Sequence, residues 1–316
     1  MPDQKHAGDQ DHARNREHPH GEHPHDAHPE DKHPHHEHPH DAPLFEAWDD
    51  HLFKGVAGHY ERGRLPYADG LADALAAELA LDGTGTLADL GCGPGTLARP
   101  LAGHFARVVA VDPDPDMVER GRELAAAAGI TTITWLTRPA EDVLFDDGEI
   151  DTAVFAQSFH WMDRGRVARN LRRALRTGGH LVHIADVKTE RPHDGGIPRT
   201  EIDTLVREFL GEVRRAGRRL LPQGTPGGEE DVLARAGFVG PRRIVVKAGG
   251  TLHRTVDDVV AEQYSMSFSA PHLFGEALGE FDARLRALLA RHAVDGGFEV
   301  GLPSTDVRVW TNPPQP

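Results

Sequence analysis

Three glycines at alternate positions, Gly91, Gly93 and Gly95, lie between two acidic residues, Asp89 and Asp112. Glycine has no β-carbon, so the backbone can turn tightly there and approach a ligand closely. Asp112 follows Gly91 by 21 residues, the separation that places a carboxylate at the ribose hydroxyls of a nucleoside. Asp89 stands two residues before the first glycine, where it suits a cationic ammonium better than a phosphate. These residue types and spacings predict a nucleoside site.

A ribose joined to an amino-acid arm is the composition of S-adenosylmethionine, and this is the ligand that the pattern favours. Two other interpretations remain. The dinucleotide fingerprint of NAD-dependent oxidoreductases is G-x-G-x-x-G, and its last glycine is replaced here by Thr96. The glycines can also form no more than a tight turn, and Asp112 can cap a helix that begins near Pro113.

The surrounding chain alternates between strand and helix patterns, which is typical of a mostly parallel sheet covered on both faces. Strands are expected at 86–90, 108–111, 131–136, 150–155, 180–184, 243–247 and 306–310. Helices are expected at 44–56, 69–81, 96–105, 117–128, 167–175, 200–219 and 231–236. The stretch 255–293 is mostly helical and predicts a cap insertion at about 250–300. The predicted fold is therefore α/β: a doubly wound, Rossmann-like sheet of seven strands in a domain spanning 44–316.

Several segments resemble the motifs of class I S-adenosylmethionine-dependent methyltransferases. Residues 87–96 (Leu-Ala-Asp-Leu-Gly-Cys-Gly-Pro-Gly-Thr) resemble the first motif of this family, and 109–113 (Val-Ala-Val-Asp-Pro) resemble the second. Residues 60–67 and 156–163 (Ala-Gln-Ser-Phe-His-Trp-Met-Asp) are similar to segments of a small-molecule subgroup that includes trans-aconitate methyltransferase-like enzymes. The resemblance runs from about residue 53 to 184 and more loosely to 310.

The resemblance implies how the nucleoside would be held. Asp112 would bind both ribose hydroxyls, and Met117 would pack on the adenine ring. The edge of the ring would meet the segment after the third strand, which is formed by Ala140, Glu141 and Asp142.

The resemblance also implies how the methionine arm would be held. Asp89 and the three glycines would contact it and the ribose, and Gln157 would lie beside the sulfonium. Tyr60 or Arg64 would lie near the carboxylate. The family's usual Arg-Pro-Pro-Tyr appears here as Arg64-Leu65-Pro66-Tyr67, a departure at one position.

Methyl transfer to a small molecule needs donor and acceptor to be aligned with water excluded, and a dedicated base is optional. His160 follows the fourth strand, so it is the best-placed candidate base. A histidine beside Trp161 can equally be a packed, hydrogen-bonded side chain. His183 lies within a predicted strand and is expected in the core. No residue of the sequence identifies the methyl acceptor.

Residues 1–43 have an unusual composition. They hold twelve of the 22 histidines and seven prolines, and Glu-His-Pro-His-Asp-Ala occurs at 22–27 and 37–42. Alternating proline blocks a helix, and so few apolar side chains cannot offset the loss of chain entropy, so a disordered tail is expected. Its imidazoles could bind transition metals loosely. A metal-binding protein is thus a further alternative, although no metal is expected at the main site.

Composition excludes several other classes. The formal net charge of −15 argues against nucleic-acid and membrane-surface partners, since both need concentrated lysine and arginine. There is no run of 18 apolar residues and no signal-peptide pattern after Met1. With Cys92 as the single cysteine, a disulfide framework is excluded. A cytoplasmic location is expected.

Overall fold

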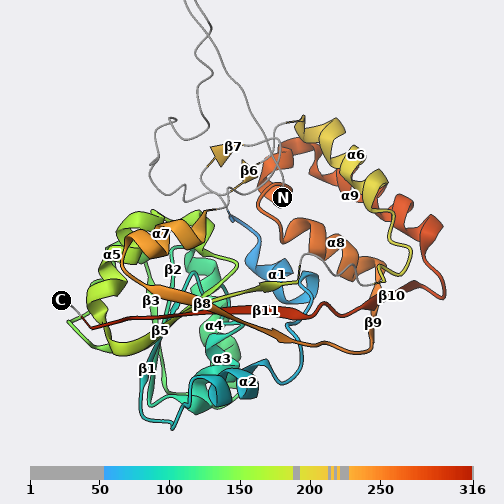
Figure 1. Ribbon diagram of the computed structural model, residues 1–316. Coiled ribbons are helices and arrows are strands. Elements are labelled where there is room, and N and C mark those ends of the chain that lie inside the picture. The colour runs from blue at the N-terminus through green and yellow to red at the C-terminus, as the bar shows by residue number, and fades with distance from the viewer. Residues whose placement is uncertain (1–52, 188–192, 213–214, 217–218, 221–227, 315–316) are drawn as a thin grey trace, which may run out of the picture. The chain divides into compact units, whose positions relative to one another are not determined.

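The computed structural model describes residues 53–187, 193–212, 215–216, 219–220 and 228–314 (Figure 1). The predicted histidine-rich tail, its metal binding and most of the helix expected at 44–56 lie outside these residues. Within the described ranges, no helix combines the length and the apolar character needed to cross a membrane.

A seven-stranded sheet forms the centre of the fold, and it confirms the predicted fold class. Its order is β3-β2-β1-β4-β5-β11-β8, in which the first five strands are parallel and β11 runs antiparallel to both of its neighbours. The strands are β1 (Thr86–Leu90), β2 (Arg107–Asp112), β3 (Ile133–Thr137), β4 (Ile150–Ala156), β5 (Leu175–Asp186), β8 (Val239–Val246) and β11 (Thr305–Thr311). Strand β5 begins before the expected residue 180, and its pairing with β4 shifts register between Ile150 and Thr152.

Helices cover both faces of the sheet, as the continuous burial of β1 and β2 requires. One face packs against α2 (Leu71–Glu78), α3 (Ala98–Leu101) and η1 (Ala102–His104). On the same face, α4 (Pro115–Ala127) packs its Gly121 against Trp135 of β3. The other face packs against α5 (Arg164–Ala174) and α7 (Glu229–Arg235). Two hydrophobic layers therefore hold the carboxyl ends of the parallel strands at one edge.

The cap of helix α4 differs from the sequence interpretation. Its N-cap is Asp114, whose carboxylate accepts hydrogen bonds from the backbone amides of Asp116 and Met117, and Pro115 follows it at the first helical position. Asp112 is therefore not the helix cap, and its carboxylate takes part in other contacts.

The helix expected at 200–219 is shorter than predicted. Helix α6 (Arg199–Leu210) ends before Gly211, which adopts a left-handed φ of 82°. Beyond it the chain forms a two-stranded sheet of β6 (Arg215–Ala216) and β7 (Arg219–Leu220) instead of a further helical turn. The left-handed glycine ends the helix that the residue pattern alone would continue.

A separate group of helices forms the cap region. It contains α8 (Val256–Tyr264), η4 (Pro271–Ala277) and α9 (Leu278–His292), preceded by β9 (Thr251–Thr255) and followed by β10 (Gly297–Gly301). A capping box of Thr255 and Asp258 begins α8. Ile202, Leu205 and Val206 of α6 share the hydrophobic core of this group, so the cap includes a helix outside the expected insertion. Figure 1 shows α6, α8 and α9 grouped beside β9 and β10.

Candidate cofactor site

The strand order reverses at β1, which has β2 on one side and β4 on the other. In open α/β sheets the crevice outside the carboxyl ends of two such strands is where ligands bind. The glycine loop follows β1 and Gln157 follows β4, so the topology brings these two predicted segments to the same crevice.

The three loop glycines all have left-handed φ angles, 73° at Gly91, 53° at Gly93 and 76° at Gly95. A β-carbon on Gly91 would lie 2.5 Å from Cβ of Ser158, and one on Gly95 would lie 2.6 Å from the ring of Trp135. The amide of Gly91 donates to the Val111 carbonyl at 2.8 Å, which ties the loop to β2. Gly91 and Gly95 are therefore required by close packing within the protein.

Gly93 is different, because its β-carbon position faces the ring of Tyr60 at 3.8 Å and meets nothing closer. An added methyl group at the middle glycine would thus be in ordinary van der Waals contact with the Tyr60 ring of helix α1 (Ala57–Gly63), without overlap. Its φ of 53° favours glycine, so the backbone conformation and not close packing accounts for this residue.

Asp112 ends β2 and holds the loop. Its Oδ2 accepts the backbone N–H of Gly93 at 2.8 Å, and its Oδ1 accepts that of Asp114 at 3.0 Å. Burial raises the pKa of Asp112 to about 6, against the opposing effect of these two amides. Each carboxylate oxygen keeps a second lone pair for a further donor.

Asp89 lies at the carboxyl end of β1 and is fully buried. Among the described residues, neither of its carboxylate oxygens has a partner in good hydrogen-bonding geometry. Burial raises the pKa of Asp89 to about 7, with the Ala98 backbone amide opposing the shift. A buried carboxylate without a partner is costly, so this position suits a cationic ligand group that would supply one.

Tyr60 and Arg64 come from α1 and the residue that ends it. The guanidinium of Arg64 lies over the Tyr60 ring at 5.3 Å from its centre, and its Nη2 donates to the Ser265 carbonyl at 2.8 Å. Its Nε is buried without a hydrogen-bond partner among the described residues. Burial raises the pKa of Tyr60, so its hydroxyl stays protonated and can donate. The two side chains form one unit beside Gly93.

Gln157 is exposed directly after β4 and has a left-handed φ of 54°, unusual for a residue with a side chain. Its Nε2 lies 3.5 Å from Oδ2 of Asp186, and its amide also meets the Tyr67 hydroxyl. A strained backbone at a strand end is typical of functional positions. The structure therefore brings Gln157, Tyr67 and Asp186 together at the crevice.

The residues predicted to contact adenine make contacts within the protein. Met117 is buried under Val56 and Ala270, with Tyr60 against the same cluster. Glu141 accepts the backbone N–H of Asp163 at 2.5 Å, and Asp142 pairs with Arg166 at 3.1 Å.

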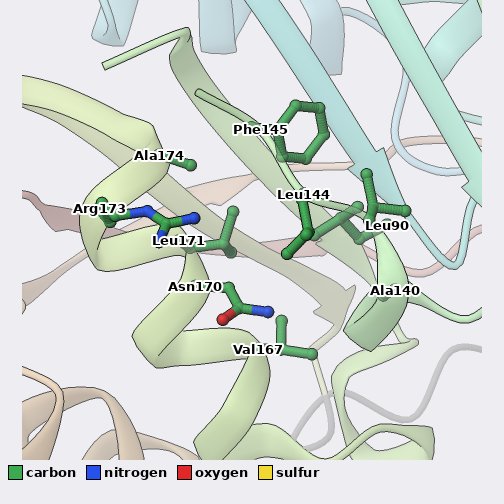
Figure 2. A pocket seen from close by; sticks show the side chains of 10 residues that line it. Leu90, Ala140, Leu144, Phe145, Val167, Asn170, Leu171, Arg173 and Ala174 are labelled. Carbon is green, nitrogen blue, oxygen red and sulfur yellow. The ribbon is translucent and has the colours of Figure 1, made fainter. Parts of the chain in front are cut away.

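The remaining residue of that segment, Ala140, points toward the core. Figure 2 shows it in a small, mainly apolar depression whose lining includes Leu90, Leu144, Val167 and Leu171. Glu141 and Asp142 make contacts within the protein, so their binding to adenine stays a prediction.

His160 lies in a short 3-10 turn, η3 (Phe159–Trp161), with its ring 4.9 Å from that of Trp161. Its charge acts on Glu229 of α7, whose pKa is lowered first by a hydrogen bond with His183 and less by His160. His183 is buried among Phe155, Phe159 and Trp310, as expected of a core residue. His160 thus lies near the pair formed by buried His183 and half-buried Glu229.

The sequence interpretation missed two residues of the crevice. Ser158 is buried and donates from Oγ to the Leu90 carbonyl at 2.5 Å, directly beneath Gly91. Asp186 ends β5 just as Asp112 ends β2, and Asp89 is the last residue but one of β1. An acidic residue at the end of a strand was therefore the signal that the sequence offered for Asp186. Cys92 is buried, and burial raises its pKa, which makes it a packed side chain and not a nucleophile.

The arrangement fits S-adenosylmethionine on observations of the chain itself. The buried Asp89 carboxylate, which has no hydrogen bond of good geometry among the described residues, suits an ammonium, and Asp112 has lone pairs left for hydroxyls. No group of three histidine, cysteine or acidic side chains that could hold a metal occurs within the described residues.

Comparisons with known proteins give the family. A family model described as a methyltransferase domain matches residues 87–179. An uncharacterized methyltransferase of Mycobacterium tuberculosis is 34% identical over 240 residues, which cover 76% of this chain and 86% of the relative. A sarcosine/dimethylglycine N-methyltransferase of Halorhodospira halochloris is 33% identical over 126 residues, covering 39% and 45%.

A crystal structure described as a methyltransferase of Bacillus halodurans is 14% identical, covers 78% of this chain and 100% of its own, and has a TM-score of 0.47. The family assignment depends on the sequence relatives and the domain match. The chain is an enzyme that belongs to the class I S-adenosylmethionine-dependent methyltransferases.

Proposed function

We propose that this enzyme transfers a methyl group from S-adenosylmethionine to a small-molecule acceptor. The observation that carries the proposal is the buried Asp89 carboxylate, whose oxygens have no hydrogen bond of good geometry among the described residues and which lies next to the glycine loop. The family membership supports the donor.

The proposed roles divide along the donor. Asp89 would pair with the ammonium, Arg64 with the carboxylate, and Asp112 with the ribose hydroxyls. The side chains proposed to complete the pocket are Tyr60, Met117, Ala140, Glu141, Asp142 and Gln157, together with the backbone at Gly91, Gly93 and Gly95.

When bound, the donor supplies an electrophilic methyl group on a sulfonium. The protein's own part is to orient and to exclude water, and orientation alone is worth as much as about 7–11 kcal/mol in favourable cases. Tyr60 of α1 and Arg64, which follows that helix, would cover the arm, and Gln157 directly after β4 would border the methyl group. These roles require a well-packed loop, which Ser158 and Trp135 provide.

Calorimetric titration tests the proposal against an NAD-dependent oxidoreductase. We expect S-adenosylhomocysteine to bind with micromolar-range affinity and NADH to give no heat. The reverse result would overturn the proposed donor.

The same titration on a chain lacking residues 1–43 tests whether the methyltransferase domain spans 44–316, as we also propose. Loss of binding there would show that the tail belongs to the site, whereas metal binding by the tail is measured separately with Ni²⁺ or Zn²⁺.

We expect Asp112→Ala to weaken S-adenosylhomocysteine binding by about 1–3 kcal/mol, the range for leaving buried polar partners unsatisfied. The variant removes the proposed ribose contact and also frees the Gly93 amide. Asp116→Ala is a matched control, because Asp116 is exposed on the same segment. Equal affinities in the two variants would remove the ribose role from Asp112.

His160 is the proposed base for acceptors that must lose a proton. His160 lies near enough to Glu229 to contribute to lowering the pKa of that carboxyl group. With an acceptor found by screening for S-adenosylhomocysteine release, we expect His160→Ala to reduce turnover by about 10²–10⁴-fold and to leave cofactor affinity unchanged. A variant that turns over normally would exclude His160 from the chemistry.

A further inference from the structure

Helix α1 carries Tyr60 and lies directly before Arg64, and it is held from two sides. Toward the sheet, Glu61 pairs with Arg99 at 3.4 Å and with Arg120 at 2.9 Å, and these arginines belong to the helices that follow β1 and β2. Toward the cap, Arg62 pairs with Asp258 of α8 at 2.6 Å. The helix therefore links the cofactor crevice to the cap.

A second link to the cap is buried. Arg254, at 2% exposure, is the largest charged side chain in the described interior, and it pairs through Nη1 with Glu262 of α8. Its Nη2 donates to the Gly63 carbonyl at 2.8 Å and to the Asp258 carbonyl at 2.7 Å. The planar guanidinium thus joins the last residue of α1 to α8 by one rigid fork.

The backbones of the two helices also touch. A β-carbon on Gly63 would lie 2.4 Å from the Ala261 carbonyl oxygen and 2.7 Å from the Glu262 nitrogen. One turn beyond Glu262, the Ser265 carbonyl accepts a hydrogen bond from Nη2 of Arg64. Arg64 is therefore held at both ends by α8: through the backbone of its neighbour Gly63 and through its own guanidinium.

We propose that Arg254 is a positioning residue for the cofactor's amino-acid arm, which it acts on through Gly63 and Arg64 without reaching the crevice. This inference rests on the proposed function, because it takes Arg64 as the partner of the arm's carboxylate. Arg199 pairs with the other oxygen of Glu262 at 2.6 Å, so the Glu262 carboxylate is held in one orientation for Arg254.

Two ligands separate a local effect on the arm from a general loss of the site. S-adenosylhomocysteine has the amino-acid arm, whereas 5′-methylthioadenosine has the same nucleoside without it. We expect Arg254→Lys to weaken S-adenosylhomocysteine binding about tenfold, within the usual range of coupling between sites, and to leave the affinity for 5′-methylthioadenosine nearly unchanged. Lysine keeps a charge for Glu262, so the fold is preserved, but it lacks the fork that reaches Gly63.

A second variant perturbs the same contact between α1 and α8 by changing Gly63. Gly63→Ala places a methyl group against the Ala261 carbonyl and leaves every charge in place. We expect the same selective loss of affinity for the ligand with the arm. Arg284→Met is the matched control, because Arg284 pairs with Glu208 inside the cap at 2.6 Å and makes no contact with α1.

Arg64→Met serves as the reference in this calorimetric series. If Arg64→Met lowers the affinity for S-adenosylhomocysteine alone while Arg254→Lys and Gly63→Ala do not, the positioning role is wrong and the proposed site stands. If Arg64→Met affects neither ligand, the carboxylate assignment of the proposed function is wrong. Equal weakening of both ligands by Arg254→Lys would show a general structural role and overturn the inference.

Discussion

Gly91→Ala is expected to abolish measurable cofactor binding and to destabilise the fold. A residue with a side chain at a φ of 73° costs about 1–2 kcal/mol. Its new methyl group would lie 2.5 Å from Cβ of Ser158, and such overpacking adds about 1–3 kcal/mol. Relief of that overlap moves the loop, and a displacement of about 1 Å at a site costs roughly 100-fold in function.

Thermal unfolding and titration with S-adenosylhomocysteine measure the two effects of this substitution. Gly103→Ala is the matched control, because Gly103 is an exposed glycine in the following turn whose β-carbon would meet nothing within 4 Å. We expect the control to bind as the wild type does. A Gly91→Ala protein with wild-type melting and affinity would show that the loop does not make these close contacts.

Asp89 is expected to make the stability of the free enzyme strongly dependent on pH. The folded protein holds the proton of Asp89 up to about pH 7, whereas an unfolded chain releases it near pH 4. Between these values unfolding releases a proton, so the free energy of unfolding falls as pH rises. The contribution is fully present below about pH 4 and is lost by about pH 7, with an upper bound of about 4 kcal/mol.

Denaturant unfolding at a series of pH values from 4 to 8 tests this expectation, with Asp89→Asn as the comparison. Asp112, whose pKa is raised to about 6, contributes with the same sign in both proteins, and subtraction of the two profiles removes it. We expect the difference to change steadily up to about pH 7 and then to level off. Saturating S-adenosylhomocysteine should shrink it, because an ammonium beside Asp89 favours the ionised form. A flat difference would contradict the buried, unpartnered state of Asp89.

Strands β1 and β2 could be predicted from sequence because they are short buried runs that end next to glycine or at aspartate. Residues 86–90 form β1 within the expected bounds, and the adjacent glycine loop adopts the left-handed angles that its composition indicates. Local chemistry decides such elements. Gly91, Gly93 and Asp112 were therefore found together at the crevice, although their contacts with the donor remain proposals.

Other features depend on partners distant in the chain, and no local pattern encodes them. Arg254 and Gly63 are 191 positions apart, and only the fold brings them together. Helix α6 was expected to continue, and its core contacts with α8 and α9 were not foreseen because they arise in packing. Within the cap, the hydroxyls of Ser265 and Ser269 donate to the carbonyls of Glu262 and Gln263.

The indole of Trp135 occupies a volume that two glycines leave free, Gly95 in the glycine loop and Gly121 in α4. A β-carbon on Gly121 would lie 2.3 Å from that ring, and one on Gly95 would lie 2.6 Å from it. The side-chain sizes that fit at positions 95, 121 and 135 therefore depend on one another. Enlarging either glycine demands a smaller aromatic, and trimming the aromatic leaves a void under both, so substitutions here are tolerated only in compensating sets.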